Sequence, residues 1–293
     1  MTAVLHTTVV AEPVAGYRLS LRRFARNKLA VAGLAVVVLF LLFCFVGPLL
    51  YSTDQTHTDL TQVNLAPGGA HLLGTDAVGH DELGRLMYGG KISLLVGLAS
   101  GLLATVIGTL WGAVAGYAGG WVDAVMMRVV DAGIAIPALF ILLVVSAITS
   151  PGALGLIVIL GLVSWLVPSR LVRAETLTLK NRDYVLTLRA TGGTHGRAIL
   201  RHILPNSVST IVVAATFQVA DAILLVAYVS YLGLGVQPPS TDWGGMLSAG
   251  LTAAYSGRWW LIVPPGLAII LVVCAFNAIG DGLRDAFDVR GRG

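Results

Sequence analysis

Long runs of apolar residues alternate with short polar segments along the whole chain. Several of these runs carry no charge and exceed the roughly 20 residues that cross a bilayer as one helix. The run from 132 to 169 is too long for a single crossing, and Ser150-Pro151-Gly152 divides it in two. The pattern predicts an all-α, polytopic integral membrane protein with six transmembrane helices, at about 29–50, 92–117, 124–149, 153–169, 207–232 and 259–279.

The connection 170–206 is the most polar segment between expected spans, and its second half has the pattern of two short helices. Asp183 can cap the first helix, and Gly192 with the glycine after it can end that helix. Thr194 can cap the second helix. Pro205 is expected to interrupt the pattern before the next apolar run.

Composition and charge support this topology. The chain is 56% hydrophobic and only 12% charged, against roughly 25% charged in soluble domains. Five Lys/Arg lie in segment 1–28, seven in 170–201 and three in the tail 281–293. Basic segments stay in the cytoplasm, so we expect both termini and the connection to be cytoplasmic, and 52–91 and 233–258 to lie outside. The net charge of +4 then comes from basic residues that mark the cytoplasmic segments, and no nucleic-acid partner is expected.

The chain lacks a recognisable nucleotide site. Around Lys91 the phosphate-loop pattern fails, because Arg85 replaces its first glycine and Ile92 its Ser/Thr. We therefore expect no cofactor in this chain, and any ATP and Mg²⁺ should be bound by partner ATPase subunits.

The sequence offers no strong candidate for a metal site or a catalytic residue. The polar residues of the first outer segment match no tight metal-ligand spacing, and no nucleophile motif suggests a catalytic residue. Cys44 and Cys274 lie in apolar runs and are expected to pack there. Arg128 and Asp131 are three residues apart and can pair on one helix face.

Short motifs follow one another in a distinctive order from residue 71 to residue 285, within a stretch of similarity that covers essentially residues 18–290. They are His71–Asp76, Gly84–Gly89, Ile92–Leu94, Gly116–Asp123, Arg128 with Asp131, Ser230–Gly235, Pro238-Pro239, Trp243-Gly244, and Asn277 with Gly280–Asp285. Together with Gly192 and the ending Ile203-Leu204-Pro205 of the polar segment, they resemble the C-type permease subunit of dipeptide/oligopeptide ABC importers, a binding-protein-dependent transport inner-membrane component. The polar segment is similar to the EAA loop of that family, on which the ATPase subunit pushes.

The resemblance implies a type I ABC importer permease fold and ATP-driven import of short peptides by alternating access. It implies three kinds of partner besides membrane lipid: a homologous second permease subunit, two cytoplasmic ATPase subunits and an extracytoplasmic substrate-binding protein. Four residues are then expected to shape the ATPase-coupling loop, namely Tyr184, Gly192, Ile203 and Pro205.

The chain departs from the family pattern in two places. Leu186-Thr187-Leu188 occupies the usual Glu-Ala-Ala, and Val226 stands where the fifth span usually carries a Glu. Asp221 lies five residues earlier, which turns a helix by about 140°, so it does not replace that Glu on the same face. Asp221 either lines the translocation path or is a buried, hydrogen-bonded structural residue; the sequence leaves both open.

Three alternatives remain. The same class of permease also imports nickel, glutathione or opines. An ion-coupled secondary transporter or channel needs several ionisable residues inside its spans, and Asp221 is the only mid-span candidate here. A membrane enzyme is less favoured still.

Overall fold

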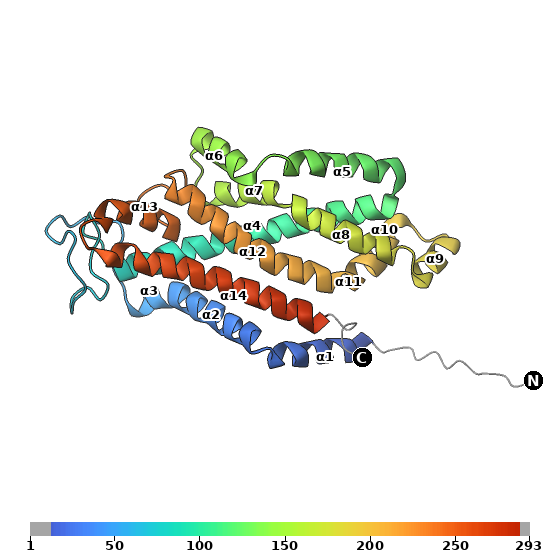
Figure 1. Cartoon of the computed structure of the whole chain (residues 1–293), viewed down its shortest axis with the longest axis horizontal. Helices are drawn as coiled ribbons and strands as arrows, with labels where there is room; N and C mark the ends of the chain where they lie inside the picture. The colour runs from blue at the N-terminus through green and yellow to red at the C-terminus, as the bar shows by residue number, and fades with distance from the viewer. Residues whose placement is uncertain (1–12, 288–293) are drawn as a thin grey trace, which may run out of the picture.

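The chain folds as a bundle of helices (Figure 1), seen in a computed structural model that describes residues 13–287. Among these residues the only β-pairing is one isolated bridge between Thr75 and Asp81. The outermost parts of the two expected terminal segments, before 13 and after 287, lie outside the described residues. The all-α membrane fold predicted from the apolar pattern is confirmed.

Within residues 13–287, four single helices are long and apolar enough to cross a membrane. They are α2 (Lys28–Phe45), α4 (Glu82–Ala118), α12 (Val208–Tyr231) and α14 (Val263–Phe287). α4 begins ten residues before the expected span at 92, because Asp81 caps it there: its Oδ1 accepts a hydrogen bond from the Gly84 N–H at 2.8 Å.

Two further spans are bent pairs of helices. α5 (Gly120–Ile134) meets α6 (Ala138–Thr149) at 74°, and α7 (Ala153–Ser164) meets α8 (Leu166–Leu179) at 45°. Pro137 precedes α6 and Pro168 lies in the first turn of α8; proline has no N–H to donate and bends or ends helices. Counting each pair as one span gives the expected six.

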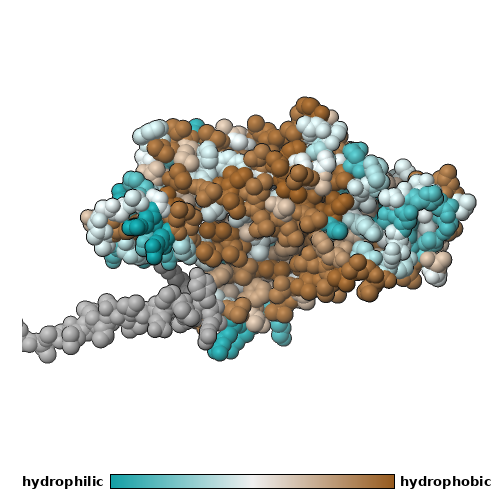
Figure 2. All heavy atoms as spheres, turned by 180° about the vertical axis from the view of Figure 1, so that it is seen from behind, coloured by the Kyte–Doolittle hydropathy of each residue, from teal (hydrophilic) through white to brown (hydrophobic). Residues whose placement is uncertain are grey.

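The remaining elements lie at the two ends of the bundle (Figure 1). Loop 51–81, α3 (Gly47–Leu50) and α13 (Trp243–Ala254) lie at one end. α1 (Pro13–Arg26) and the end of α14 lie towards the opposite end, where the polar connection is found. A hydrophobic belt separates the two hydrophilic ends (Figure 2), which is the surface pattern of a protein with a lipid-facing middle.

α4 is the central helix and packs against α2, α5, α7, α8, α12 and α13. Two of its glycines allow helix backbones to approach closely. A Cβ at Gly101 would meet the backbone of Val219 in α12, and one at Gly112 would meet the backbone of Ser169 in α8. Small residues at such contacts are typical of packed membrane helices.

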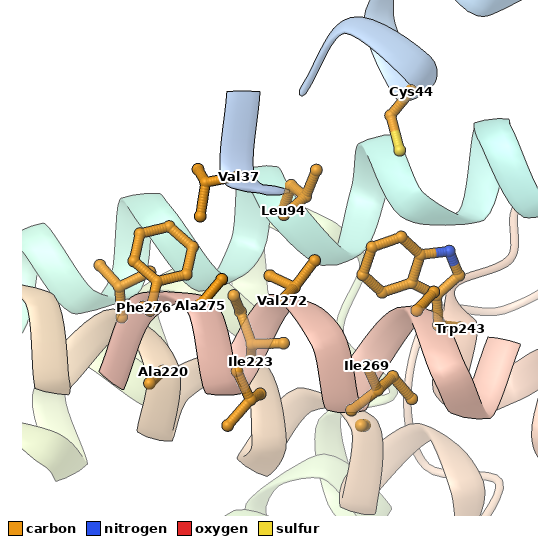
Figure 3. Packing of buried hydrophobic residues seen from close by; sticks show 14 of the residues in the cluster. Val37, Cys44, Leu94, Ala220, Ile223, Trp243, Ile269, Val272, Ala275 and Phe276 are labelled. Atoms are coloured by element: carbon orange, nitrogen blue, oxygen red, sulfur yellow. The ribbon is translucent and has the colours of Figure 1, made fainter. Parts of the chain in front are cut away.

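The largest apolar core lies between α2, α4, α12, α13 and α14, and Trp243 is at one end of it (Figure 3). The buried indole packs edge-on to Phe40, and its Nε1 donates to the Leu86 carbonyl oxygen at 3.0 Å. Cys44 is buried in this core, as expected, whereas Cys274 is exposed on α14. The expected packing role is therefore confirmed for Cys44 alone.

Candidate functional site

The polar connection forms a compact loop at one end of the bundle (Figure 1). Its first ten residues continue α8 as far as Leu179. α9 (Asp183–Ala190) follows and is the first of the two expected short helices. The second expected helix is composite. It consists of α10 (His195–Ala198), a π-helical turn Ile199–Ile203 and α11 (Leu204–Asn206).

A tight turn at Gly192 separates α9 from α10. Gly192 has φ +82°, and its N–H donates to the Arg189 carbonyl oxygen at 3.1 Å. Thr194 then caps α10 by accepting a hydrogen bond from the Arg197 N–H at 3.3 Å. The expected helix stop at Gly192 and cap at Thr194 are both confirmed.

Two local expectations about this loop are wrong. Arg182, not Asp183, is the N-cap of α9, and Asp183 lies in the first turn, where a carboxylate interacts favourably with the helix dipole. Pro205 does not interrupt the helical path, because it lies in the first turn of α11, where a missing N–H costs little. The helical path is interrupted at Ser207, which separates α11 from α12 (Val208–Tyr231) and whose hydroxyl donates to the Ile203 carbonyl oxygen at 2.9 Å.

A small apolar core anchors the loop to the bundle. Val185, Ala198 and Ile203 of the loop are buried against Tyr117 at the end of α4 and Leu179 at the end of α8. Ile203, predicted as a loop-shaping residue, is therefore an anchor. The sequence pattern did not single out Tyr117, Val185 or Ala198 as its partners.

Tyr184 and Pro205, the other predicted loop residues, lie at the surface. The Tyr184 side chain is 41% exposed, and its ring lies 6.2 Å from that of His202. Pro205 is exposed. The structure thus separates the predicted set into one turn residue, Gly192, one buried anchor, Ile203, and two surface residues.

Polar contacts add to the apolar anchor at the end of α4. The Lys180 ammonium donates to the Gly116 carbonyl oxygen at 2.8 Å, a favourable place for a cation because helix C-termini carry partial negative charge. The Arg189 guanidinium lies 5.9 Å from the Tyr117 ring centre, and the His195 ring packs edge-on to it at 5.5 Å. The loop is thus tied to the bundle on both sides of its turn.

Two ion pairs join the bent spans α5 and α8. Arg173 binds Asp123 through two hydrogen bonds, at 2.5 and 2.6 Å, in a half-buried pair. Arg170 binds Asp131 at 2.6 Å in an exposed pair. The expected pairing of Arg128 with Asp131 is wrong. Asp131 pairs with Arg170 instead, because α5 packs beside α8. Within one helix, a basic residue that precedes an acidic one also pairs more weakly than the reverse order.

These pairs give a matched test of stability. Arg173→Met should lower the free energy of unfolding by about 1.5–3 kcal/mol, because hydrogen bonds to charged groups have that value and Asp123 would lose its partner. Arg170→Met removes an exposed pair and should cost only about 0–1 kcal/mol. Thermal unfolding of the detergent-solubilised chain compares them, and equal shifts would contradict a structural role of the Arg173 pair.

At the other end of the bundle, polar side chains bind one another. Asp81 Oδ2 accepts hydrogen bonds from the Tyr51 hydroxyl and from His71 Nδ1, both at 2.9 Å. Burial, followed by the neighbouring Asp81 carboxylate, raises the pKa of Tyr51 to about 12. Within residues 13–287 no three metal-ligating side chains are grouped to hold an ion.

A cavity of about 350 Å³ lies where the bends of α5–α6 and α7–α8 face α12. Asp221 is exposed and lines it, with Gln218, Ser164 and Tyr228 among its neighbours. Val226 is buried in an apolar cluster, on another face of α12 as expected from the helical turn. No described residue forms a hydrogen bond or ion pair with Asp221.

Comparison with known proteins identifies the class of protein. Residues 108–293 match the family model of the binding-protein-dependent transport system inner membrane component. Residues 17–67 match the N-terminal transmembrane domain of oligopeptide transport permease C. The chain therefore belongs to the family of binding-protein-dependent inner-membrane transport components, which are multi-pass membrane proteins.

Individual relatives cover most of the chain. A protein of Brucella suis named as a candidate peptide permease is 44% identical over 272 residues, covering 92% of this chain and 90% of its own. The dipeptide transport system permease protein DppC of Bacillus subtilis is 39% identical, covering 91% of this chain and 83% of its own. The oligopeptide transport system permease protein OppC of Haemophilus influenzae is 38% identical, with 92% and 88% covered.

Proposed function

We propose that this chain is one of two permease subunits of an ATP-driven importer that moves short peptides across the cytoplasmic membrane by alternating access. The observation that carries the proposal is the loop 183–206, anchored by a buried apolar core to the ends of α4 and α8. The names of the peptide permease relatives support the substrate class.

The loop has the properties of a force-transmitting element. Three buried side chains, together with the contacts of Arg189 and His195 to Tyr117, fix it to two different spans, so a displacement of the loop must move α4 and α8 with it. Two cytoplasmic ATPases close on ATP and Mg²⁺ and push this surface. The chain itself contributes no nucleotide site and no bond chemistry, and a second, homologous permease subunit completes the path.

The cavity at Asp221 lies on the proposed path. A carboxylate at this depth is costly against lipid, so this face of α12 is expected to meet the second permease subunit or a water-filled path. An extracytoplasmic binding protein delivers the solute to the opposite end of the bundle, formed by loop 51–81 and α13. Import of nickel, glutathione or opines by the same mechanism is the second candidate.

Reconstitution tests the proposal. Proteoliposomes holding the chain, the second permease subunit and both ATPases should accumulate a labelled peptide only with the binding protein and ATP. The chain alone should hydrolyse no ATP. ATP turnover by the purified chain alone, or peptide uptake that persists without the ATPases, would contradict the assignment.

The orientation has its own prediction. Leu60 lies in the outer segment and Leu200 in the coupling loop, with 75% and 65% of their surfaces exposed. In a background in which Cys44 and Cys274 are alanine, Leu60→Cys should react with a membrane-impermeant thiol reagent in intact cells. Leu200→Cys should react only after the membrane is opened, and labelling of both positions in intact cells would contradict cytoplasmic placement of the loop.

A further inference from the structure

The cavity beside Asp221 contains polar groups for which the described residues provide no partner. The Gln218 side chain is 6% exposed, lines the cavity and makes no hydrogen bond to a described residue. Ser164 lines the same cavity, and its buried Oγ also lacks a partner. Buried polar groups are normally hydrogen-bonded, and leaving them unpaired is costly. A solute that enters the cavity can supply the missing partner of the Gln218 amide, which borders it.

The spacing of Asp221 and Gln218 indicates which solute group fits. The two residues are three apart on α12, so their Cβ atoms are about 5–6 Å apart on one face. A carboxylate attracts a cation, whereas an amide donates one hydrogen bond and accepts another. In a peptide, one Cα separates the terminal ammonium group from the first peptide group, and that peptide group also donates and accepts.

We infer that this cavity is a subsite for the amino-terminal end of a peptide, in which Asp221 pairs with the terminal ammonium group and Gln218 hydrogen-bonds the first peptide group. The inference rests on the proposed peptide transport and adds a recognition role for residues of this chain. The remaining lining includes Leu224, Leu225 and Ile136, which can contact the apolar part of a side chain. A volume of about 350 Å³ is in the range of small-ligand sites.

The lining disfavours a bare metal cation as occupant. Asp221 is the only carboxylate among the lining residues, and these include neither histidine nor cysteine. A divalent ion takes several such ligands. Gln218, by contrast, carries a neutral amide suited to hydrogen-bond an amide of the solute.

Uptake by the complete transporter, with its second permease, ATPases and binding protein, tests both contacts separately. Three probes are compared: trialanine, its N-acetyl derivative, and an analogue whose first peptide bond is an ester. Asp221→Asn should lower trialanine uptake about tenfold and leave N-acetyl uptake nearly unchanged. Gln218→Leu should lower trialanine uptake about fivefold and have a smaller effect on the ester. Each rate is divided by the wild-type rate for the same probe, which cancels the preference of the binding protein.

Asp281→Asn is the matched control, because Asp281 is an exposed carboxylate on α14 outside the cavity. Its uptake of each probe should equal that of the wild-type transporter. Equal losses on all three probes, or no loss, would overturn the inference. If wild-type transporter imports no peptide that its binding protein binds, the proposed function fails instead.

A second measurement does not depend on the Asp221 and Gln218 variants. Leu225 lines the cavity one helical turn from Asp221. In a cysteine-free background, Leu225→Cys in the assembled transporter should react with a small cationic thiol reagent. Trialanine should slow that reaction at least threefold more than N-acetyl-trialanine does, and equal protection would overturn the subsite.

Discussion

Gly192→Val should abolish transport, or reduce it more than about tenfold, while the protein still inserts and assembles. Gly192 has φ +82° and forms the turn between α9 and α10. This conformation costs a residue with a Cβ about 1–2 kcal/mol, and a β-branched side chain more. Nothing lies within 4 Å of a Cβ built there, so the strain comes from the backbone alone. We expect the loop to relieve this strain by changing the angle between α9 and α10, the two helices proposed to meet the ATPase.

Gly196→Val is the matched control. A Cβ at Gly196 also meets nothing within 4 Å, but Gly196 lies in α10 and has no positive φ. It receives the same added side chain without the strained turn, so its transport should stay within about threefold of wild type. Peptide uptake and ATP hydrolysis by reconstituted transporter compare the two, and equal uptake by both variants would show that the turn geometry does not matter.

The features of the loop that could be predicted depend on local chemistry. A glycine pair after a helical pattern requires a left-handed stop, and a threonine before the next helical pattern can cap it. Gly192 and Thr194 confirm this reasoning. Pro205 shows its limit, since a proline can begin a helical turn as readily as it ends one.

Contacts between segments that are far apart in the sequence could not be predicted from residue spacing. Asp131 pairs with Arg170, 39 positions away, because α5 and α8 lie side by side. Tyr117 is a partner of the coupling loop only because α4 ends beside it. Gln218 looks like any polar residue in a span, and only the burial of its side chain within a cavity distinguishes it. Sequence periodicity therefore predicted the spans, whereas the candidate site required their arrangement.

Trp243→Ala should cause the largest loss of stability of any single substitution considered for this chain. Replacing a fully buried aromatic residue by alanine costs about 3–5 kcal/mol, from lost apolar burial and the cavity that remains. The indole fills the space beside Gly90, where a Cβ would meet its ring. Its loss would also leave the Leu86 carbonyl oxygen without the hydrogen bond from Nε1.

Trp121→Ala is the control for this prediction, because Trp121 is 77% exposed at the start of α5 and should change stability by less than about 1 kcal/mol. Trp243→Phe should fall between the two, since it keeps most of the apolar ring but no N–H. Denaturant or thermal unfolding in detergent measures the series.

Trp243 connects α13 to α4 at the end of the bundle opposite the coupling loop, so its loss should loosen α13 while α9 and α10 keep their contacts. Equal destabilisation by Trp243→Ala and Trp121→Ala would show that this connection does not hold the bundle together.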